Sequence, residues 1–175
     1  SIFYKIIILG KADGSNPFLC LNMKRSKTKR IRLRKLAPED WERILEIEKS
    51  SFPIDGYSKE RIFRLCSVSA NNFVLAVFGE KPVGYILACP KKESMDIDSI
   101  AVDAAYRNLG IGRKLIMSAI RKSRTMKLNK VLLEVRINNK AATSFYKRLG
   151  FTAAGIIKKY YKDGSPAQKM VLNLK

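Results

Sequence analysis

The segment VDAAYRNLGIGRKL, residues 102–115, places two glycines one residue apart between an expected strand and an expected helix. The first turn of a helix has backbone N–H groups without partners and a partial positive charge, so it can bind a phosphate. Glycine lets the backbone approach such a ligand, and Arg107, Arg113 and Lys114 add positive charge. The segment predicts an anion site between a strand and a helix, although a turn that binds nothing can have the same glycine spacing.

Two common phosphate-binding patterns do not fit this segment, because both require a glycine at the position of Leu115. A Walker A loop needs that glycine after Gly110, and a dinucleotide fingerprint needs it after Gly112. A third pattern has Arg or Gln, then Gly three residues later, then Gly or Ala two residues after that. Arg107, Gly110 and Gly112 satisfy this third pattern completely.

Apolar periodicity predicts strands and helices along the rest of the chain. KVLLEVRI, residues 130–137, is typical of a central strand covered on both faces. In residues 94–102, strict alternation places Ile97, Ser99 and Ala101 on one face, and Asp98, Ile100 and Val102 on the other. The remaining expected elements are a hairpin at 72–89, strands at 30–36, 151–161 and 167–174, and helices at 37–50, 58–67, 112–127 and 139–150. This order predicts a mixed α/β sheet in one domain.

Residues 1–28 are predicted to be an N-terminal extension that precedes a single domain at 29–175. FYKIIIL at 3–9 and FLCLN at 18–22 have the composition of two strands, so a β-hairpin is expected within the extension. The extension lacks the basic start and the small-residue cleavage site of a signal peptide. Met23 begins a basic stretch that would serve as a translation start, so residues 1–22 are interpreted as lying outside the core fold.

The charge of the chain limits its partners and its chemistry. Lys and Arg number 35 against 15 Asp and Glu, a formal net charge of +20, which favours a phosphorylated cofactor, the ribosome or nucleic acid as partner. A basic surface that is merely solvated would have the same charge. The chain has no histidine, which excludes Ser-His and Cys-His catalysis.

Cysteine spacing and hydropathy limit the location of the protein. The three cysteines are far apart and form no CxxC motif, so neither a disulfide framework nor a metal site is expected; they are Cys20, Cys66 and Cys89. A reducing, cytoplasmic location is the simplest inference. No window of about 18 uninterrupted apolar residues occurs, so no membrane span is expected.

Two segments in combination resemble the core motifs of the GNAT acetyltransferase superfamily. They are IAVDAAYRNLGIGRKL at 100–115 and LLEVRINNKAATSFYKRLGF at 132–151. The second is similar to the LEVRxSNxxAxxLYxxxGF pattern of the protein N-terminal acetyltransferase branch, which includes the ribosomal-protein-alanine acetyltransferases. The matching residues are Leu133, Glu134, Val135, Arg136, Asn139, Ala142, Tyr146, Gly150 and Phe151. The resemblance covers residues 29–174 and implies a GNAT-type three-layer fold, with a mixed, mostly antiparallel central sheet flanked by helices.

Four positions depart from the pattern of this branch. Ala104 stands where the family usually has proline, which loosens a turn without removing chemistry. Asn138 replaces a serine, and Phe145 replaces a leucine. Tyr57, in the sequence FPIDGYS, stands where many relatives have tryptophan, so the substrate preference of the branch does not carry over.

The resemblance implies that acetyl-CoA is the cosubstrate and that no metal takes part. Its pantetheine arm is expected to pair with the backbone of Ile100, Ala101 and Val102. Asn139 and Tyr146 are further contacts that the family pattern implies. The diphosphate is expected at the backbone N–H groups of Arg107, Asn108, Leu109, Gly110, Ile111, Gly112, Arg113 and Lys114.

Glu134 and Tyr146 match the catalytic positions of the branch. A glutamate among apolar strand neighbours has a raised pKa, which suits a general base acting directly or through a water. Tyr146 is the candidate acid for the departing thiolate. The alternatives are that Glu134 forms a salt bridge with Arg136, which lies on the same strand face, and that Tyr146 only packs in the core.

Aromatic residues in two loops are the candidate walls of a peptide groove. They are Phe52, Pro53 and Tyr57 in the first loop, and Tyr160 and Tyr161 in the last hairpin. Asp55 is considered as an acceptor for the substrate ammonium. Simple core filling is the alternative for the aromatic residues.

The expected function is transfer of an acetyl group from acetyl-CoA to the free N-terminus of a protein. One alternative is acetylation of a lysine side chain or a small amine, and another is a basic protein that binds nucleic acid or the ribosome. The charge could also hold such an enzyme at the ribosome, where nascent N-termini emerge. The sequence predicts neither the preferred N-terminal residue nor the oligomeric state.

Overall fold

The computed structural model describes residues 5–7 and 30–174. One sheet contains the strands in the order β2-β3-β4-β5-β6-β8-β7, and β1 pairs with β5 beside this path. The strands are β1 (Lys5–Ile7), β2 (Ile31–Lys35), β3 (Phe73–Phe78), β4 (Lys81–Pro90), β5 (Ser94–Val102), β6 (Lys130–Arg136), β7 (Thr152–Ile157) and β8 (Ala167–Asn173). The helices are α2 (Trp41–Ser51), α3 (Lys59–Val68), α4 (Ile111–Thr125) and α5 (Lys140–Arg148), with short 3-10 turns at Pro38–Asp40, Ala70–Asn72 and Ala104–Tyr106.

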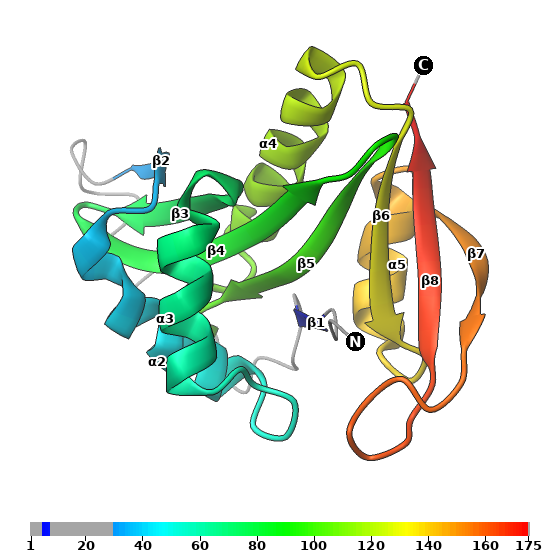
Figure 1. Cartoon of the computed structure of the whole chain (residues 1–175), viewed down its shortest axis with the longest axis horizontal. Coiled ribbons are helices and arrows are strands. Elements are labelled where there is room, and N and C mark those ends of the chain that lie inside the picture. Colours follow the sequence, from blue (N-terminus) through cyan, green and yellow to red (C-terminus); the bar gives the residue numbers. More distant parts are fainter. Residues whose placement is uncertain (1–4, 8–29, 175) are drawn as a thin grey trace.

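The sheet divides where β5 meets β6. β5 and β6 are the parallel pair along the sheet path. Their pairing is short and extends from Ser94 opposite Lys130 to Asp96 opposite Leu132. Beyond these residues the strands separate, and Figure 1 shows them adjacent at the top and apart at the bottom, with β1 between them. We call this divergence of β5 and β6 the fork. The mixed, mostly antiparallel sheet confirms the predicted fold class.

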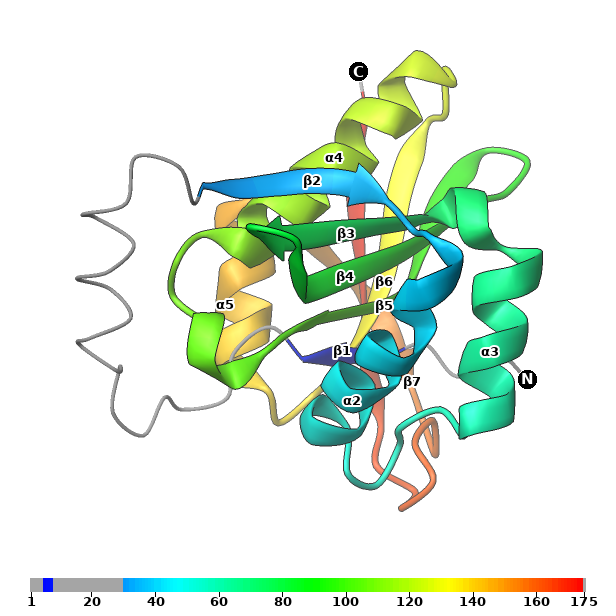
Figure 2. The ribbon, with the colours of Figure 1, turned by 90° about the vertical axis from the view of Figure 1, so that its left-hand side faces the viewer.

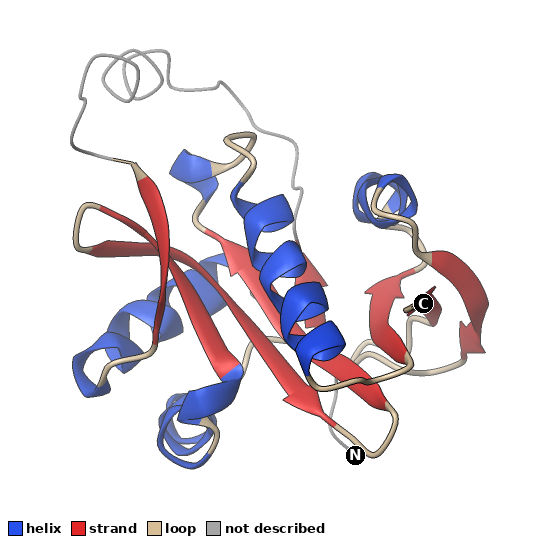
Figure 3. Ribbon diagram, turned by 90° about the horizontal axis from the view of Figure 1, so that it is seen from above, coloured by secondary structure: helices blue, strands red, loops and turns tan. Residues whose placement is uncertain are grey.

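Helices cover both faces of the sheet (Figure 2). On one face, α2 and α3 pack through Ile44 and Ile62 against a cluster that includes Tyr85 of β4. On the other face, Leu115 of α4 and Tyr146 of α5 belong to the larger core cluster. Figure 3, seen from above, shows the strands in red running between the blue helices. This arrangement is the predicted three-layer fold.

The predicted strict alternation in β5 is wrong at Asp98. The pairing with β4 shifts there, because Leu87 lies opposite Ser99 while Ala88 lies opposite Ile97. The extra residue of this β-bulge reverses the faces of the residues before it, since successive side chains of a strand alternate. Ile97 therefore joins the larger core cluster. Ser99 and Ala101, by contrast, keep the face predicted for them.

Local sequence signals place the ends of the helices as expected. The side chain of Ser58 accepts the N–H of Arg61 at 3.3 Å and caps α3. Gly150 has φ +93°, a conformation that favours glycine, and follows the end of α5. Pro38 opens a 3-10 turn that leads into α2.

Gly84 of β4 lies where α4 comes close to the sheet. A Cβ at this position would lie 2.9 Å from the carbonyl oxygen of Ala101 and 3.4 Å from Cγ2 of Ile111, the first residue of α4. The absence of a side chain therefore allows the backbone of β4 to lie close to the carbonyl oxygen of Ala101 at the end of β5.

The predicted N-terminal extension lies mostly outside the described residues. The strand expected at 3–9 includes β1, which pairs in parallel with β5, while the strand expected at 18–22 lies outside the described part. The hairpin therefore stays a prediction. Among the helices of the described residues, none combines the length and the apolar character that a membrane crossing requires.

Candidate active site

The glycine segment forms a pocket at the start of α4. The pocket has a volume of about 180 Å³. Its lining contains seven of the predicted cofactor residues, Val102, Arg107, Asn108, Gly110, Ile111, Gly112 and Arg113, together with Tyr106, Phe145 and Arg148. The lining thus brings three arginines to the N-terminal end of a 15-residue helix. Both features favour a polyanionic ligand.

The backbone of this segment has the conformation that the glycine pattern predicts. Gly110 is the N-cap of α4 with φ +74°, and an added Cβ would meet no atom within 4 Å there. Asn108 also has positive φ, at 63°. Arg107 donates from Nε to the carbonyl oxygen of Val102 at 3.2 Å, so its side chain turns back toward the end of β5. The empty space above Gly110 leaves room for a ligand against the backbone.

Of the eight residues predicted to meet the diphosphate, two lie outside this pocket. Leu109 packs against the larger core cluster. Lys114 donates from Nζ to the carbonyl oxygen of Ile31 at 3.4 Å and lines a separate groove beside β2. Only their backbone groups could contribute to the predicted site.

The backbone expected to pair with pantetheine lies at the fork. The side chains of Ile100 and Ala101 are fully buried in the cores on opposite faces of the sheet, so backbone contacts are what they can offer a ligand. In this structure the same edge is paired with β1, with Ile6 opposite Ile100 and Ile7 opposite Ala101. A cosubstrate that used this edge would have to displace β1.

Glu134 lies on β6 just past the last residue that pairs with β5. Its side chain is buried, and Glu134 is 7% exposed. Burial raises the pKa of Glu134 to about 7; Lys169, opposite it on β8, lowers the pKa, and Asp96 and Asp98 raise it. A carboxyl group with this pKa can exchange a proton near neutral pH. The alternative salt bridge with Arg136 is wrong, because Arg136 pairs with other carboxylates.

Tyr146 is fully buried on α5 and packs edge-on against Phe145 and Phe151. Its hydroxyl is nevertheless without a hydrogen-bond partner among the described residues. Burial raises the pKa of Tyr146 well above its ordinary value, so the hydroxyl keeps its proton. A residue that only filled the core would not need this hydroxyl, because an unpaired buried polar group is unfavourable.

Asn139 has a structural role at the start of α5. Its Oδ1 accepts the N–H of Ala142 at 3.0 Å, which caps the helix. A contact to a cofactor would therefore be made by the amide nitrogen of the same side chain.

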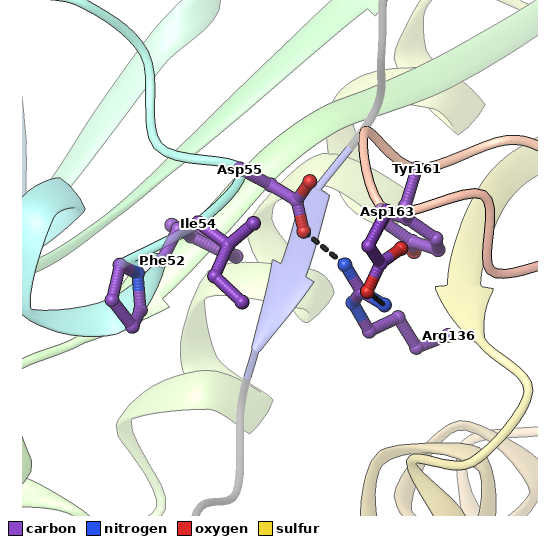
Figure 4. Close-up of a pocket in the computed structure, with 7 residues that line it drawn as sticks. Phe52, Ile54, Asp55, Arg136, Tyr161 and Asp163 are labelled. Atoms are coloured by element: carbon purple, nitrogen blue, oxygen red, sulfur yellow. Dashed lines mark hydrogen bonds and ion pairs between the residues drawn. The ribbon is translucent and has the colours of Figure 1, made fainter.

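A second pocket, of about 240 Å³, lies between the loop after α2 and the loop between β7 and β8 (Figure 4). It is lined by Phe52, Pro53, Ile54, Asp55, Arg136, Tyr161 and Asp163. It thus brings together three of the five predicted substrate residues, Phe52, Pro53 and Tyr161. We call it the loop pocket.

The other two predicted substrate residues lie beside this lining. Tyr57 is buried in the smaller core cluster, and Arg61 stacks on its ring. Tyr160 packs its ring edge-on against Tyr161, with centroids 5.0 Å apart. Tyr57 shares this cluster with Phe52, and Tyr160 contacts Tyr161, so each residue is linked to one wall of the loop pocket.

The first loop is anchored to the sheet by Glu48, a fully buried carboxylate on α2. Glu48 accepts the N–H of Tyr57 at 3.0 Å and the hydroxyl of Tyr85, and that hydroxyl is also 2.9 Å from Oγ of Ser99. This buried network fixes the loop after α2 relative to β4 and β5.

Ile54, Arg136 and Asp163 are the residues of the loop pocket that sequence reasoning missed. Arg136 is ion-paired with both Asp55 and Asp163 and lies over the ring of Tyr161, with Cζ 4.0 Å from the ring centroid. The period of the strand indicated that Arg136 shares a face with Glu134, but nothing local indicated its partners, which come from distant loops. Asp55, considered as an acceptor for the substrate ammonium, is engaged by Arg136.

Groups of three or more metal-ligating side chains are absent from residues 5–7 and 30–174.

Comparison with known proteins identifies the family. The chain matches the acetyltransferase (GNAT) family model over residues 41–151, a span that contains the glycine segment, Glu134 and Tyr146. The protein belongs to the GNAT family and is an acetyl-CoA-dependent acetyltransferase.

Particular relatives extend this comparison. An N-alpha-acetyltransferase of Sulfurisphaera tokodaii is 31% identical over 163 residues, which cover 85% of this chain and 96% of the relative. The putative ribosomal protein bS18-alanine N-acetyltransferase of Bacillus subtilis is 31% identical and covers 75% of this chain and 87% of its own. Among solved structures, Ard1 from Thermoplasma volcanium superposes with a TM-score of 0.77 at 27% identity, covering 83% of this chain and 98% of that one.

Proposed function

We propose that this chain transfers the acetyl group of acetyl-CoA to the free α-amine of a protein N-terminus. The observation that carries the proposal is the position of Glu134, a buried carboxyl group with a pKa of about 7 at the fork. The names of the relatives, N-alpha-acetyltransferase and ribosomal-protein-alanine acetyltransferase, support it.

The pocket at the start of α4 is the proposed site of the coenzyme A diphosphate. Its three arginines and the unpartnered N–H groups of the helix match a ligand with several negative charges. The backbone of residues 100–102 would pair with the pantetheine amides, and the amide nitrogen of Asn139 would add a contact. When bound in this way, acetyl-CoA supplies an activated acetyl group as a thioester.

Glu134 is proposed to accept the proton of the attacking amine. A free α-amine has a pKa near 8, about one unit above that of Glu134, so the transfer is only slightly uphill. The amine nitrogen forms a bond to the thioester carbonyl carbon, and the C–S bond breaks. Tyr146, which is protonated before the reaction, donates its hydroxyl proton to the departing thiolate and regains a proton from the second N–H that the nitrogen loses as the amide forms.

The loop pocket is the proposed site of the first residue of the peptide. Phe52, Pro53 and Ile54 form one side, and Tyr161 forms the other, so the lining favours an apolar first side chain. Ile54 is 63% exposed, so its apolar side chain is accessible to a ligand in this pocket. Tyr57 and Tyr160 would act by supporting these walls.

A pair of peptides tests the proposal against the alternative of lysine or small-amine acetylation. The first peptide has a free N-terminus and no lysine, and the second has a blocked N-terminus and one lysine. A lysine amine has a pKa of about 10.4, which adds about 3 kcal/mol to the deprotonation. We expect turnover with the first peptide alone; equal or greater turnover of the second would overturn the N-terminal assignment. Glu134→Gln and Tyr146→Phe serve as controls for the site.

The basic surface supports a second proposal, association with the ribosome. The outward face of α4 and the turn after it carry exposed cations at Arg113, Lys114, Arg121, Arg124 and Lys127. Such a surface binds RNA phosphates in a salt-dependent manner. We expect cosedimentation with ribosomes that weakens steeply as salt is raised, consistent with a cytoplasmic enzyme. Failure to cosediment even at low salt would reject this association and leave the catalytic proposal unaffected.

A further inference from the structure

Arg136 connects the two loops that form the loop pocket. Its guanidinium is ion-paired with Asp55 in the loop after α2 and, at 2.9 Å, with Asp163 in the loop between β7 and β8. Figure 4 shows Arg136 between these two carboxylates. It also donates to the hydroxyl of Ser165 and stacks on the ring of Tyr161. One side chain thus touches both walls.

Asp55 joins the loops in a second way. Its Oδ1 accepts the backbone N–H of Lys162 at 3.3 Å, across 107 positions of sequence. Asp55 is only 6% exposed, so this contact is shielded from water and from salt. The two walls are therefore connected through one buried carboxylate and one guanidinium.

The chemistry of these contacts requires arginine. A guanidinium is a planar fork with five donors, so it can bind two carboxylates at once and stack on an aromatic ring. A lysine ammonium is a point charge and cannot do both in this geometry. Hydrogen bonds to Ser165, and then to Arg136, lower the pKa of Asp163 to about 2, so the carboxylate keeps its charge at any working pH.

Arg136 also relates the loops to the catalytic strand. It lies two residues after Glu134 on β6, and residues at this spacing share one face of a strand. A shift of either loop away from Arg136 would change its position relative to Glu134. The bridge therefore sets both the width of the pocket and its register with the base.

We propose that Arg136 is a positioning residue that, through Asp55 and Asp163, holds the two walls of the peptide pocket at a fixed separation and in register with Glu134. This inference rests on the proposed function, because it assumes that the peptide binds between these loops. Arg136 need not touch the peptide to act in this way.

Steady-state kinetics with a free-N-terminus peptide test the proposal. Arg136→Gln is expected to raise the peptide KM at least about tenfold, since loss of positioning weakens productive binding, while the KM for acetyl-CoA stays within about twofold. Arg136→Lys is expected to recover little of this loss. The matched control is Arg32→Gln, which removes an exposed arginine from its ion pair with Glu80 on the far edge of the sheet and should leave both KM values unchanged.

Hydrogen exchange of the same variants separates positioning from direct contact. In Arg136→Gln we expect faster exchange in residues 52–57 and 158–166, and unchanged exchange in α4. A raised peptide KM without faster exchange would mean that Arg136 contacts the peptide directly, and faster exchange with an unchanged KM would mean a structural role only. Either result overturns the proposal. If the wild-type chain does not acetylate the peptide at all, the proposed function fails, while the exchange result still reports on the bridge.

A double variant provides an independent check. If Asp55 and Arg136 act as one unit, Asp55→Asn combined with Arg136→Gln should raise the peptide KM no more than the stronger single variant does. If the increases in peptide KM of the two single variants multiply in the double variant, Asp55 and Arg136 act separately, and the proposal is overturned.

Discussion

Glu134 of β6 lies directly opposite Lys169 of β8 in the antiparallel register, so a buried acid has a cation as its cross-strand neighbour. The positive charge stabilises the carboxylate and opposes the effect of burial on the pKa of Glu134. The balance between these two influences leaves that pKa at about 7.

Lys169→Met is expected to raise the pKa of Glu134 above 7, because the opposing charge is lost while burial remains. If Glu134 must be deprotonated to act, the acidic limb of kcat/KM against pH should move to higher pH. Lys169→Arg keeps the charge and should leave the limb in place. A limb that does not move in Lys169→Met would mean that another group titrates there.

Glu134→Gln is expected to lower kcat by about 100-fold or more, because the proposed base is lost. The same substitution is expected to raise the free energy of unfolding at pH 8. The folded pKa of about 7 exceeds the ordinary value of 4.5, so the wild-type fold loses stability as pH rises between these values. Gln has no charge to bury, so the free energy of unfolding of Glu134→Gln at pH 8 should exceed that of the wild type by about 1–3 kcal/mol. Urea unfolding at pH 5 and pH 8 measures it; a gain that is equal at both values would contradict the titration.

Tyr146→Phe is expected to lower kcat by about 100-fold. Its thermal stability should change little. The hydroxyl has no hydrogen-bond partner in the described part of the chain, so the fold does not depend on it. Tyr146→Ala is the contrasting variant, because it removes a fully buried ring and should destabilise by about 3–5 kcal/mol. Full activity in Tyr146→Phe would assign this residue to the core alone.

Gly110→Ala is expected to weaken coenzyme A binding by more than the backbone strain of an alanine at this position accounts for. The alanine must adopt φ near +74°, which destabilises the fold by about 1 kcal/mol. Gly79→Ala is a matched control, since Gly79 has φ +63° and open space around it but lies in the turn between β3 and β4. Calorimetry should show weaker binding for Gly110→Ala alone; equal affinities would place the diphosphate elsewhere.

Ile6→Pro is expected to lower the KM for acetyl-CoA. Proline cannot donate a backbone hydrogen bond and is unfavourable in a strand, so it should release β1 from Ser99, Ile100 and Ala101. Those backbone groups would then be free for pantetheine. Ile6→Val, which keeps the N–H and favours a strand, should behave as wild type. An unchanged KM in both variants would show that β1 and the cosubstrate do not compete.

Local patterns predicted the fold and the pocket at α4 because the signals are contained within short segments. The glycine spacing fixed the start of α4, and Ser58 and Gly150 marked helix ends at the expected places. The β-bulge at Asp98 was not predicted, since a bulge depends on pairing with β4 and leaves no signature in the alternation of β5 itself.

The loop pocket was predicted less completely than the α4 pocket for the same physical reason. Phe52, Pro53 and Tyr161 have the composition of a groove, but Asp163 lies 108 positions after Asp55, and only the fold brings them to one guanidinium. The pairing of β1 with β5 is equally non-local. Interactions of this kind require the register of the whole sheet.

The close approach at Gly84 has a consequence for the anion site. A methyl group on this residue would lie 2.9 Å from the carbonyl oxygen of Ala101, so β4 and β5 would have to move apart at that point. The backbone of residues 100–102, the proposed partner of the pantetheine arm that reaches the anion site, would then shift with β5. One missing carbon atom in β4 thus keeps the end of the neighbouring strand in place.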